Sequence, residues 1–333
     1  MRTAIIASVL ALYSSAAFAA DSVYQAKTPV TLVIEGLVLG RDGLSGDSYT
    51  QPVSSLQLAP GDLAPGVGGG VRATAEFPVD AVGPLGTGTI QIGGFYALGF
   101  NAGGVIDAGS NSLFINYGSD VDPGSDEIST DPHQDAYILD ISQDTSIGGA
   151  EVNFVSMPAG GEGVPGFFAG ASFLHFGEDF DAAIQDDASP SGYDESFTIG
   201  TTNNLVGGQV GVTGFADMGN GVKIGGRVAG GLYANFVTQE RDFSGAPNVS
   251  NPSFSDSVDD VVFAQSLELS PRVAIDLGNN VELTAGGMLL WLNGVSEASP
   301  QFMTVTDQDH TDVGADGSVL FYGGSIGLKI KLN

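Results

Sequence analysis

The chain has 333 residues, 50 of them glycine and none cysteine, and its 39 acidic residues outnumber its 10 basic residues, giving a net charge of −29. Without cysteine, a disulfide scaffold and a cysteine-ligated metal site are both excluded. The acidic balance argues against a nucleic-acid partner, because phosphate backbones are bound by clustered cations. Hydrophobic residues make up 42% of the chain, which is more apolar material than a disordered acidic chain contains.

The N-terminus has the pattern of a secretory signal peptide. Arg2 supplies a positive charge, residues 5–12 are apolar, and Ala17 and Ala19 form a small-residue cleavage site around Phe18. We therefore expect an exported protein with a signal peptide over residues 1–19. Beyond it, no run of about 18 apolar residues predicts a membrane-spanning helix. A soluble exported protein, a solenoid and a membrane β-barrel remain open.

After the signal peptide, apolar and polar residues alternate in segments of roughly ten residues, which predicts strands rather than helices. Asn220 and Gly221 predict a hairpin turn between two of these strands. We expect about 12 strands. They lie at residues 30–39, 70–77, 89–100, 136–143, 147–155, 167–176, 197–201 running into 205–215, 221–238, 261–277, 281–292 and 320–332, with one or two near 113–117.

The connections between these strands differ in length. Tight turns are expected at residues 217–221 and 278–280. Long, acidic connections are expected at residues 119–135, 178–195, 241–260 and 298–317. Such asymmetry is typical of outer-membrane barrels, which have short periplasmic turns and long outer loops.

Most basic residues fall on the strand face opposite the apolar residues. A charge on the lipid face of a barrel costs about 2–4 kcal/mol at the bilayer midplane, whereas a lumen-facing charge does not. A soluble β-sandwich would also alternate, but it does not explain the asymmetry of the connections. We therefore predict an all-β fold, a closed antiparallel up-and-down transmembrane β-barrel over residues 20–333, located in the outer membrane.

The end of the chain follows the pattern polar-x-Gly-x-x-apolar-x-apolar, formed by Ser325, Gly327, Ile330 and Leu332. This pattern resembles the assembly signal of bacterial outer-membrane barrels, although Leu332 and one extra residue, Asn333, replace the usual terminal aromatic residue. The last strand of such a barrel seals it against the first strand.

A longer resemblance covers about residues 135–333. In order and spacing, its segments resemble a family of porin-like, pore-forming outer-membrane barrel proteins of Gram-negative bacteria, distinct from the trimeric general porins. The resemblance implies a water-filled or partly plugged lumen and no catalysis, with outer-membrane lipid and the barrel assembly machinery as partners. The segments that carry it include residues 151–154, 170–180, 202–211, 226–235, 268–273, 289–292 and 323–328.

Charged residues on the inner strand face are the candidate pore lining. Opposed charges in a narrow pore set its selectivity, although the same residues can instead pair across the lumen. We expect a pore for passive diffusion of small hydrophilic solutes or ions; the alternative is a non-conducting structural or adhesive barrel whose acidic loops bind cations or a surface partner. The candidate residues are Arg72, Lys223, Arg227, Glu268, Arg272, Asp276, Glu282, Lys329 and Lys331.

No firm metal site, cofactor or catalytic residue is expected. Asp120, Asp122, Asp126 and Glu127 could bind a divalent cation weakly, but they follow no EF-hand spacing, and a hydrated acidic surface explains them better. The histidines His133, His175 and His310 have no serine nucleophile in a recognisable context. We therefore expect that the protein is not an enzyme.

Six aromatic residues near predicted strand ends fit girdles at the two membrane interfaces, with ordinary core positions as the alternative. They are Tyr96, Phe173, Phe176, Phe236, Trp291 and Tyr322.

Overall fold

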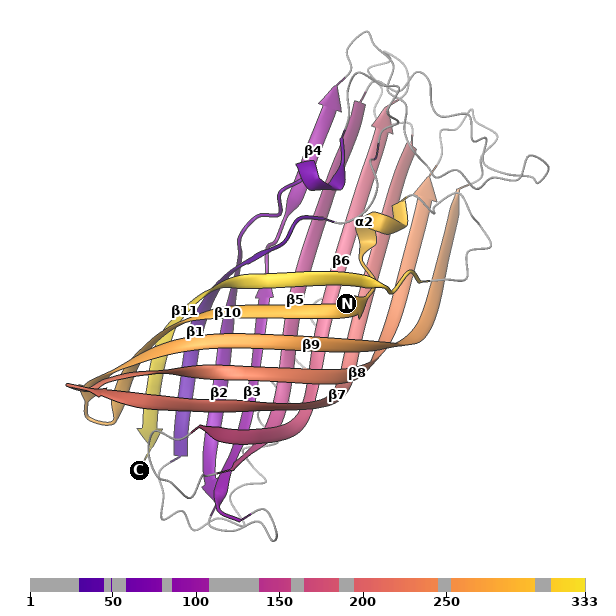
Figure 1. Ribbon diagram of the computed structural model, residues 1–333. Helices are drawn as coiled ribbons and strands as arrows, with labels where there is room; N and C mark the ends of the chain where they lie inside the picture. Colours follow the sequence, from indigo (N-terminus) through magenta and orange to yellow (C-terminus); the bar gives the residue numbers. More distant parts are fainter. Residues whose placement is uncertain are drawn as a thin grey trace.

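The computed structural model describes residues 30–44, 49, 58–79, 86–107, 138–156, 165–185, 195–244, 253–302 and 313–332. Within these ranges, antiparallel strands form one sheet that closes on itself (Figure 1). The predicted signal peptide over residues 1–19 and the strands expected near residues 113–117 lie outside the described residues.

The described part contains eleven strands, and pairing of β3 with β5 completes a ring of ten. The remaining strand, β4, continues the line of β3 along β5: β3 pairs with residues 146–156 of β5, and β4 pairs with residues 138–143. The predicted closed antiparallel β-barrel is confirmed, with eleven strands where about 12 were expected. The strands are β1 Val30–Arg41, β2 Gly68–Val79, β3 Gly88–Leu98, β4 Ala102–Asp107, β5 Ile138–Ser156, β6 Gly166–Gln185, β7 Glu195–Gly219, β8 Val222–Ser244, β9 Phe254–Gly278, β10 Val281–Val295 and β11 Gly317–Leu332.

β11 seals the barrel against β1 along the full length of β1, as predicted for the last strand. Gly327 lies opposite Glu35 in this pairing, and an added Cβ there would sit 2.0 Å from the carbonyl oxygen of Ile34. Only glycine fits this close approach. The end pattern of Ser325, Gly327, Ile330 and Leu332 therefore lies in the closing strand, and its role as an assembly signal stays a prediction.

The two tight turns lie at the end of the barrel where β1 begins and β11 finishes. Asn220 joins β7 to β8 with φ 53°, and Asn279 and Asn280 join β9 to β10 with φ 53° and 65°. Asparagine tolerates this left-handed conformation, which a two-residue hairpin loop requires. Both turns predicted from the sequence are confirmed.

Two of the predicted long connections are wrong in their bounds. β6 continues to Gln185 and β7 begins at Glu195, while β8 continues to Ser244 and β9 begins at Phe254. Their inner face keeps buried apolar side chains such as Phe180 and Ile184 beside buried polar ones such as Glu178, and their outer face becomes acidic. Acidic residues on the outer face therefore made these strand ends resemble polar loops in the sequence, although the strands continue beyond the apolar belt.

The long connections at the other end of the barrel hold two short helical segments. These are η1 Pro60–Asp62, between β1 and β2, and α2 Ala298–Gln301, between β10 and β11. In Figure 1, α2 lies against the wall formed by the longer strands, which rise above the level where β10 ends. No helix among the described residues is long and apolar enough to cross a membrane.

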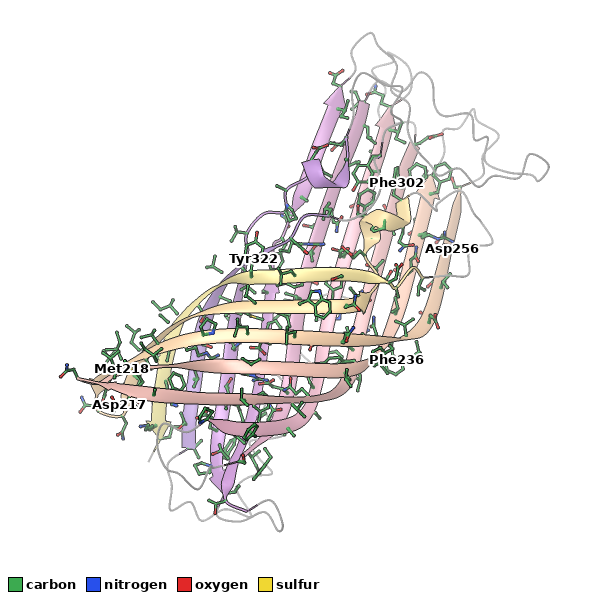
Figure 2. The ribbon with its side chains drawn as sticks, viewed as in Figure 1. Asp217, Met218, Phe236, Asp256, Phe302 and Tyr322 are labelled. Atoms are coloured by element: carbon green, nitrogen blue, oxygen red, sulfur yellow. The ribbon has the colours of Figure 1, made fainter. Side chains whose placement is uncertain are left out.

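Side chains fill the interior in two apolar clusters. The middle cluster includes Leu39, Phe100, Phe176, Leu205, Leu290 and Phe321. The mouth cluster, near the long connections, includes Tyr49, Ile141, Phe180, Phe197, Ala298 and Phe302. Figure 2 places Phe302 of the mouth cluster far from Asp217 and Met218, which mark the tight-turn end.

Candidate functional site: the lumen and its mouth

An apolar belt surrounds the outside of the barrel. All eight described basic residues lie on the opposite, inner face, as the alternation predicted. An exposed apolar band of this kind is suited to lipid. Every ring strand contributes to it, through exposed side chains that include Ile34, Val38, Val71, Leu98, Val152, Phe167, Val206, Val210, Leu232, Leu267, Leu289 and Ile326.

Above the belt, towards the long connections, the outer face of β5 to β9 becomes acidic. The change follows one row of paired residues, from Ser146 through Gly177 and Thr202 to Thr238. Carboxylates replace aliphatic side chains beyond this row, so the strands leave the apolar surroundings there. We call this surface the acidic platform; it consists of Asp140, Asp144, Asp179, Asp181, Glu240, Asp242 and Asp259.

The lumen beneath the middle cluster contains a cavity of about 80 Å³. All ten ring strands contribute residues to its lining, so it lies inside the barrel. The candidate residues Arg72, Arg227, Glu268 and Arg272 are brought together around it.

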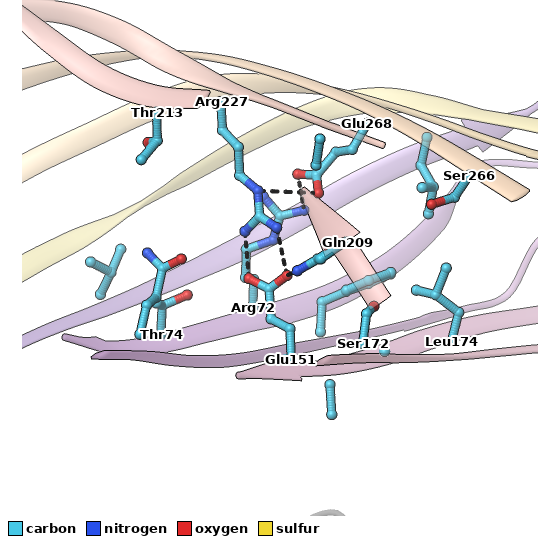
Figure 3. Close-up of a pocket in the computed structure, with 18 of the residues that line it drawn as sticks. Arg72, Thr74, Glu151, Ser172, Leu174, Gln209, Thr213, Arg227, Ser266 and Glu268 are labelled. Carbon is cyan, nitrogen blue, oxygen red and sulfur yellow. Dashed lines mark hydrogen bonds and ion pairs between the residues drawn. The ribbon is translucent and has the colours of Figure 1, made fainter. Parts of the chain in front are cut away.

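Arg72, Arg227 and Glu268 form ion pairs around the cavity, with one another and with Glu151 (Figure 3). Arg227 on β8 donates to both carboxylate oxygens of Glu151 on β5, with 2.6 Å between Nη2 and Oε2. Its Nε lies 3.7 Å from Oε2 of Glu268, and the Oε1 of Glu268 lies 3.6 Å from Nη2 of Arg72. Gln209 on β7 donates to Glu151 at 2.7 Å. The ion pairs thus cross the lumen.

A further pair completes the balance of charge around the cavity. Arg272 on β9 donates to Glu35 on β1 at 2.9 Å, and Ser325 donates to the other oxygen of Glu35 at 3.4 Å. Three guanidinium groups therefore face three carboxylates. This arrangement is the one that stabilises buried charges.

The other candidate residues lie nearer the tight-turn end. Glu282 accepts a hydrogen bond from Lys223 at 2.7 Å and lies 3.6 Å from the ammonium of Lys331. Lys329 lies 3.7 Å from Glu76. Asp276 is not brought into the lumen: it is exposed beside the β9–β10 turn and accepts a hydrogen bond from the amide of Gly278 at 2.8 Å. That all these residues line a conducting pore stays a prediction.

Aromatic side chains meet across the middle of the lumen. Phe176 on β6 and Phe321 on β11 are fully buried, with ring centroids 6.1 Å apart, and Phe100 packs 5.4 Å from Phe321. Four strands separate β6 from β11 in each direction around the ring, so opposite walls touch. We call Phe100, Phe176 and Phe321 the aromatic bridge.

The sequence suggested that Phe176 is a girdle residue. This is wrong, because its side chain points into the lumen. Phe236 and Tyr322 do lie on the outer face, where nearly half of each side chain is exposed (Figure 2).

Sequence reasoning missed the acidic partners Glu35 and Glu151. The sequence contained a signal for both. Each lies in an expected strand, at an inward position between neighbours that face outward, as Glu35 does between Ile34 and Gly36.

Above the aromatic bridge, burial raises the pKa of Tyr49 to about 12. The Tyr49 hydroxyl shares a hydrogen bond with Ser299, and its ring packs 5.7 Å from Phe180. A phenol with a raised pKa stabilises the fold fully below its unfolded pKa, near 10, and loses that contribution as the pH rises towards 12.

We therefore expect the free energy of unfolding to fall by about 2–3 kcal/mol more in the wild type than in Tyr49→Phe between about pH 9 and pH 12. Denaturant unfolding at both pH values measures this difference. An equal fall in the two proteins would contradict the buried phenol.

The candidate cation residues Asp120, Asp122, Asp126 and Glu127 lie outside the described residues, as do His133 and His310. His175 lies on the outer face, its Nδ1 3.0 Å from Oδ1 of Asn204. Within the described ranges, no group of three or more His, Asp or Glu side chains is placed to hold a metal ion.

The chain matches no protein-family model and no curated protein. Among solved structures it is similar to the outer membrane protease OmpT from Escherichia coli, with 8% identity over 91% of this chain and 97% of that one, and a TM-score of 0.39. The translocator domain of autotransporter NalP from Neisseria meningitidis has 11% identity over 98% and 96%, with a TM-score of 0.35. An anion-selective porin from Comamonas acidovorans has 10% identity over 92% and 99%, with a TM-score of 0.17. The likeness is one of outer-membrane barrel architecture.

This comparison corrects one expectation from the sequence. We expected no enzyme because the histidines lack a serine nucleophile context and because the resemblance to porin-like barrels implies no catalysis, yet a barrel among these structures, OmpT, is a protease. Barrel architecture therefore does not exclude catalysis.

Proposed function

We propose that the protein is an integral outer-membrane β-barrel with a closed lumen, which holds the acidic platform outside the membrane. This is the structural or adhesive alternative raised by the sequence, rather than the passive pore. The observation that carries it is the aromatic bridge, in which side chains from opposite walls touch, with Phe176 and Phe321 fully buried.

The outer-membrane location is supported by the outside of the barrel. The apolar belt involves every ring strand, and basic residues of the described part are confined to the inner face. Short turns at one end and long connections at the other match the periplasmic and outer sides of such barrels. The predicted signal peptide agrees with this location.

The closed lumen is supported by three successive layers of side chains. The ion pairs around the small cavity, the middle cluster with its aromatic bridge, and the mouth cluster follow one another along the barrel. Barrels of about eight strands have interiors just wide enough for side chains to fill them, and a ring of ten is close to that size. The resemblance to porin-like proteins supports the barrel, and the water-filled or partly plugged lumen that it implies is the alternative that the following test addresses.

The test is single-channel recording of the detergent-purified, refolded protein in a planar bilayer with a salt gradient. We expect no discrete conductance steps, while a porin added to the same bilayer gives them. Heat-modifiable migration in gels shows that the sample is folded. Regular steps from the folded protein would overturn the proposal and restore the passive pore.

A further inference from the structure

The chain turns into the barrel where β10 ends. We call residues 294–302 the strap. Every residue of the strap except Pro300 is buried, so the alternation of inward and outward side chains stops at Gly294. Gly294 has φ 79°, and an added Cβ would lie 2.4 Å from the carbonyl oxygen of Phe263, so this inward turn requires glycine. Val295 joins the middle cluster and Phe302 joins the mouth cluster.

Side-chain amides of β7 and β8 hold the strap by its backbone. The Nδ2 of Asn203 on β7 donates to the carbonyl of Ser296 at 2.8 Å, and the Ser296 amide donates back to Oδ1 of Asn203 at 2.8 Å. Asn235 on β8 donates to the carbonyl of Gly294 at 3.0 Å and to Oδ1 of Asn203 at 2.9 Å. Both asparagines are fully buried. The wall thus binds the strap much as a neighbouring strand would.

A buried cluster of charged side chains, centred on Arg41, holds the rest of the strap. Arg41 on β1 lies between Glu178 on β6, to which it donates, and Glu297 of the strap, at 3.2 Å. The second oxygen of Glu178 accepts a hydrogen bond from the backbone amide of Ala298 at 2.8 Å. Thr145 on β5 accepts from Arg41 at 2.9 Å. Side chains from both sides of the barrel therefore converge on this one segment.

The wall around the strap carries more polar groups than the strap uses. Gln143 and Gln239 are buried, and neither the nitrogen nor the oxygen of either amide has a hydrogen-bond partner. The hydroxyl of Thr201, which lies between Glu178 and Gln239 in the strand register, has none either. Unpaired buried polar groups destabilise the docked arrangement, and water would satisfy all of them with the strap displaced. These polar groups lie on the same strands as the apolar mouth cluster.

We infer that the strap is a releasable lid, docked here in its closed position over a polar vestibule that ends below at the aromatic bridge. Release moves residues 294–302 out of the mouth and lets water reach Asn203, Asn235 and the unpaired glutamines. This inference rests on the proposed function in one respect: the aromatic bridge, not the strap, closes the lumen, so release leaves the barrel non-conducting.

The chain has no cysteine, so a single introduced thiol reports the position of the strap. Ser299→Cys places it at a buried strap position, and Ser142→Cys places it at an exposed position on β5 as a reference for full labelling. In the folded protein in detergent, we expect a polyethylene glycol maleimide to label Ser299→Cys far more slowly than Ser142→Cys. Equal rates would overturn the docked position.

Asn203→Leu then removes the backbone clamp at nearly constant volume, and Asn204→Leu makes the same change on the outer face of the next residue. We expect Asn203→Leu to raise the labelling rate of Ser299→Cys by at least about tenfold, because a lost buried hydrogen bond shifts an equilibrium by that order. Asn204→Leu is expected to leave the rate unchanged. Where Asn203→Leu fails to fold, Glu178→Gln provides the second test. Unchanged labelling in the folded clamp variants would overturn the lid.

Bilayer recordings of the same variants separate this inference from the proposed function. Fast labelling of Ser299→Cys without conductance supports both. Fast labelling together with conductance steps keeps the lid but overturns the closed lumen, since the strap itself would then be the seal.

Discussion

Replacement of Arg227 by methionine is expected to lower the free energy of unfolding by about 3–5 kcal/mol, because removing one partner of a buried ion pair leaves an uncompensated charge. Arg227 is the shared partner of Glu151 and Glu268, and all three are largely buried in the lumen. Denaturant unfolding in detergent measures the loss, with the single tryptophan, Trp291, as the fluorescent probe.

Two further variants show whether burial sets this cost. In the double variant Arg227→Met with Glu151→Leu, much of the loss should be recovered, since the stranded carboxylate is gone. Lys331→Met removes a cation whose side chain is 41% exposed and 3.6 Å from Glu282, so its effect should stay below about 1 kcal/mol. Losses of similar size for Arg227→Met and Lys331→Met would contradict the buried network.

Truncation of Phe321 to alanine is the second change with a large expected effect, a loss of about 3–5 kcal/mol. Phe321 is fully buried and packs against both Phe100 and Phe176, so its removal leaves a cavity in the middle of the lumen. The same unfolding assay applies.

The neighbouring residue on β11 provides the matched control. Tyr322 points outward with 47% of its surface exposed, so Tyr322→Ala should cost roughly half as much or less, because fewer packing contacts disappear. The reverse order would mean that β11 has the opposite face towards the lumen, which would overturn the aromatic bridge.

The fold could be predicted because alternation is a local signal. On β8, Lys223 and Arg227 alternate with Ile224 and Val228, and the structure places the first pair inside and the second outside. The closing strand and the tight turns are likewise local features, since Asn220 tolerates the backbone conformation that a two-residue loop needs.

The contents of the lumen could not be predicted in the same way. Arg227 meets Glu151 because strand register and the curvature of a ten-strand ring bring β8 and β5 together across the interior. Neither the strand register nor the curvature of the ring can be derived from a local sequence pattern. The strap was missed for a related reason. Residues 298–317 were expected to form a long acidic connection, and the burial of Ser296 and Glu297 just before it depends on the distant residues Asn203 and Arg41.

The confinement of basic residues to the inner face of the barrel wall also determines which cleavage sites a protease can reach. Enzymes that cleave after lysine or arginine need an extended chain segment with that side chain free to enter a pocket. In the described part of the chain, all eight such side chains point inward from hydrogen-bonded strands. The folded barrel thus offers trypsin-like enzymes no site there, and the same residues become cleavable only when the strands separate.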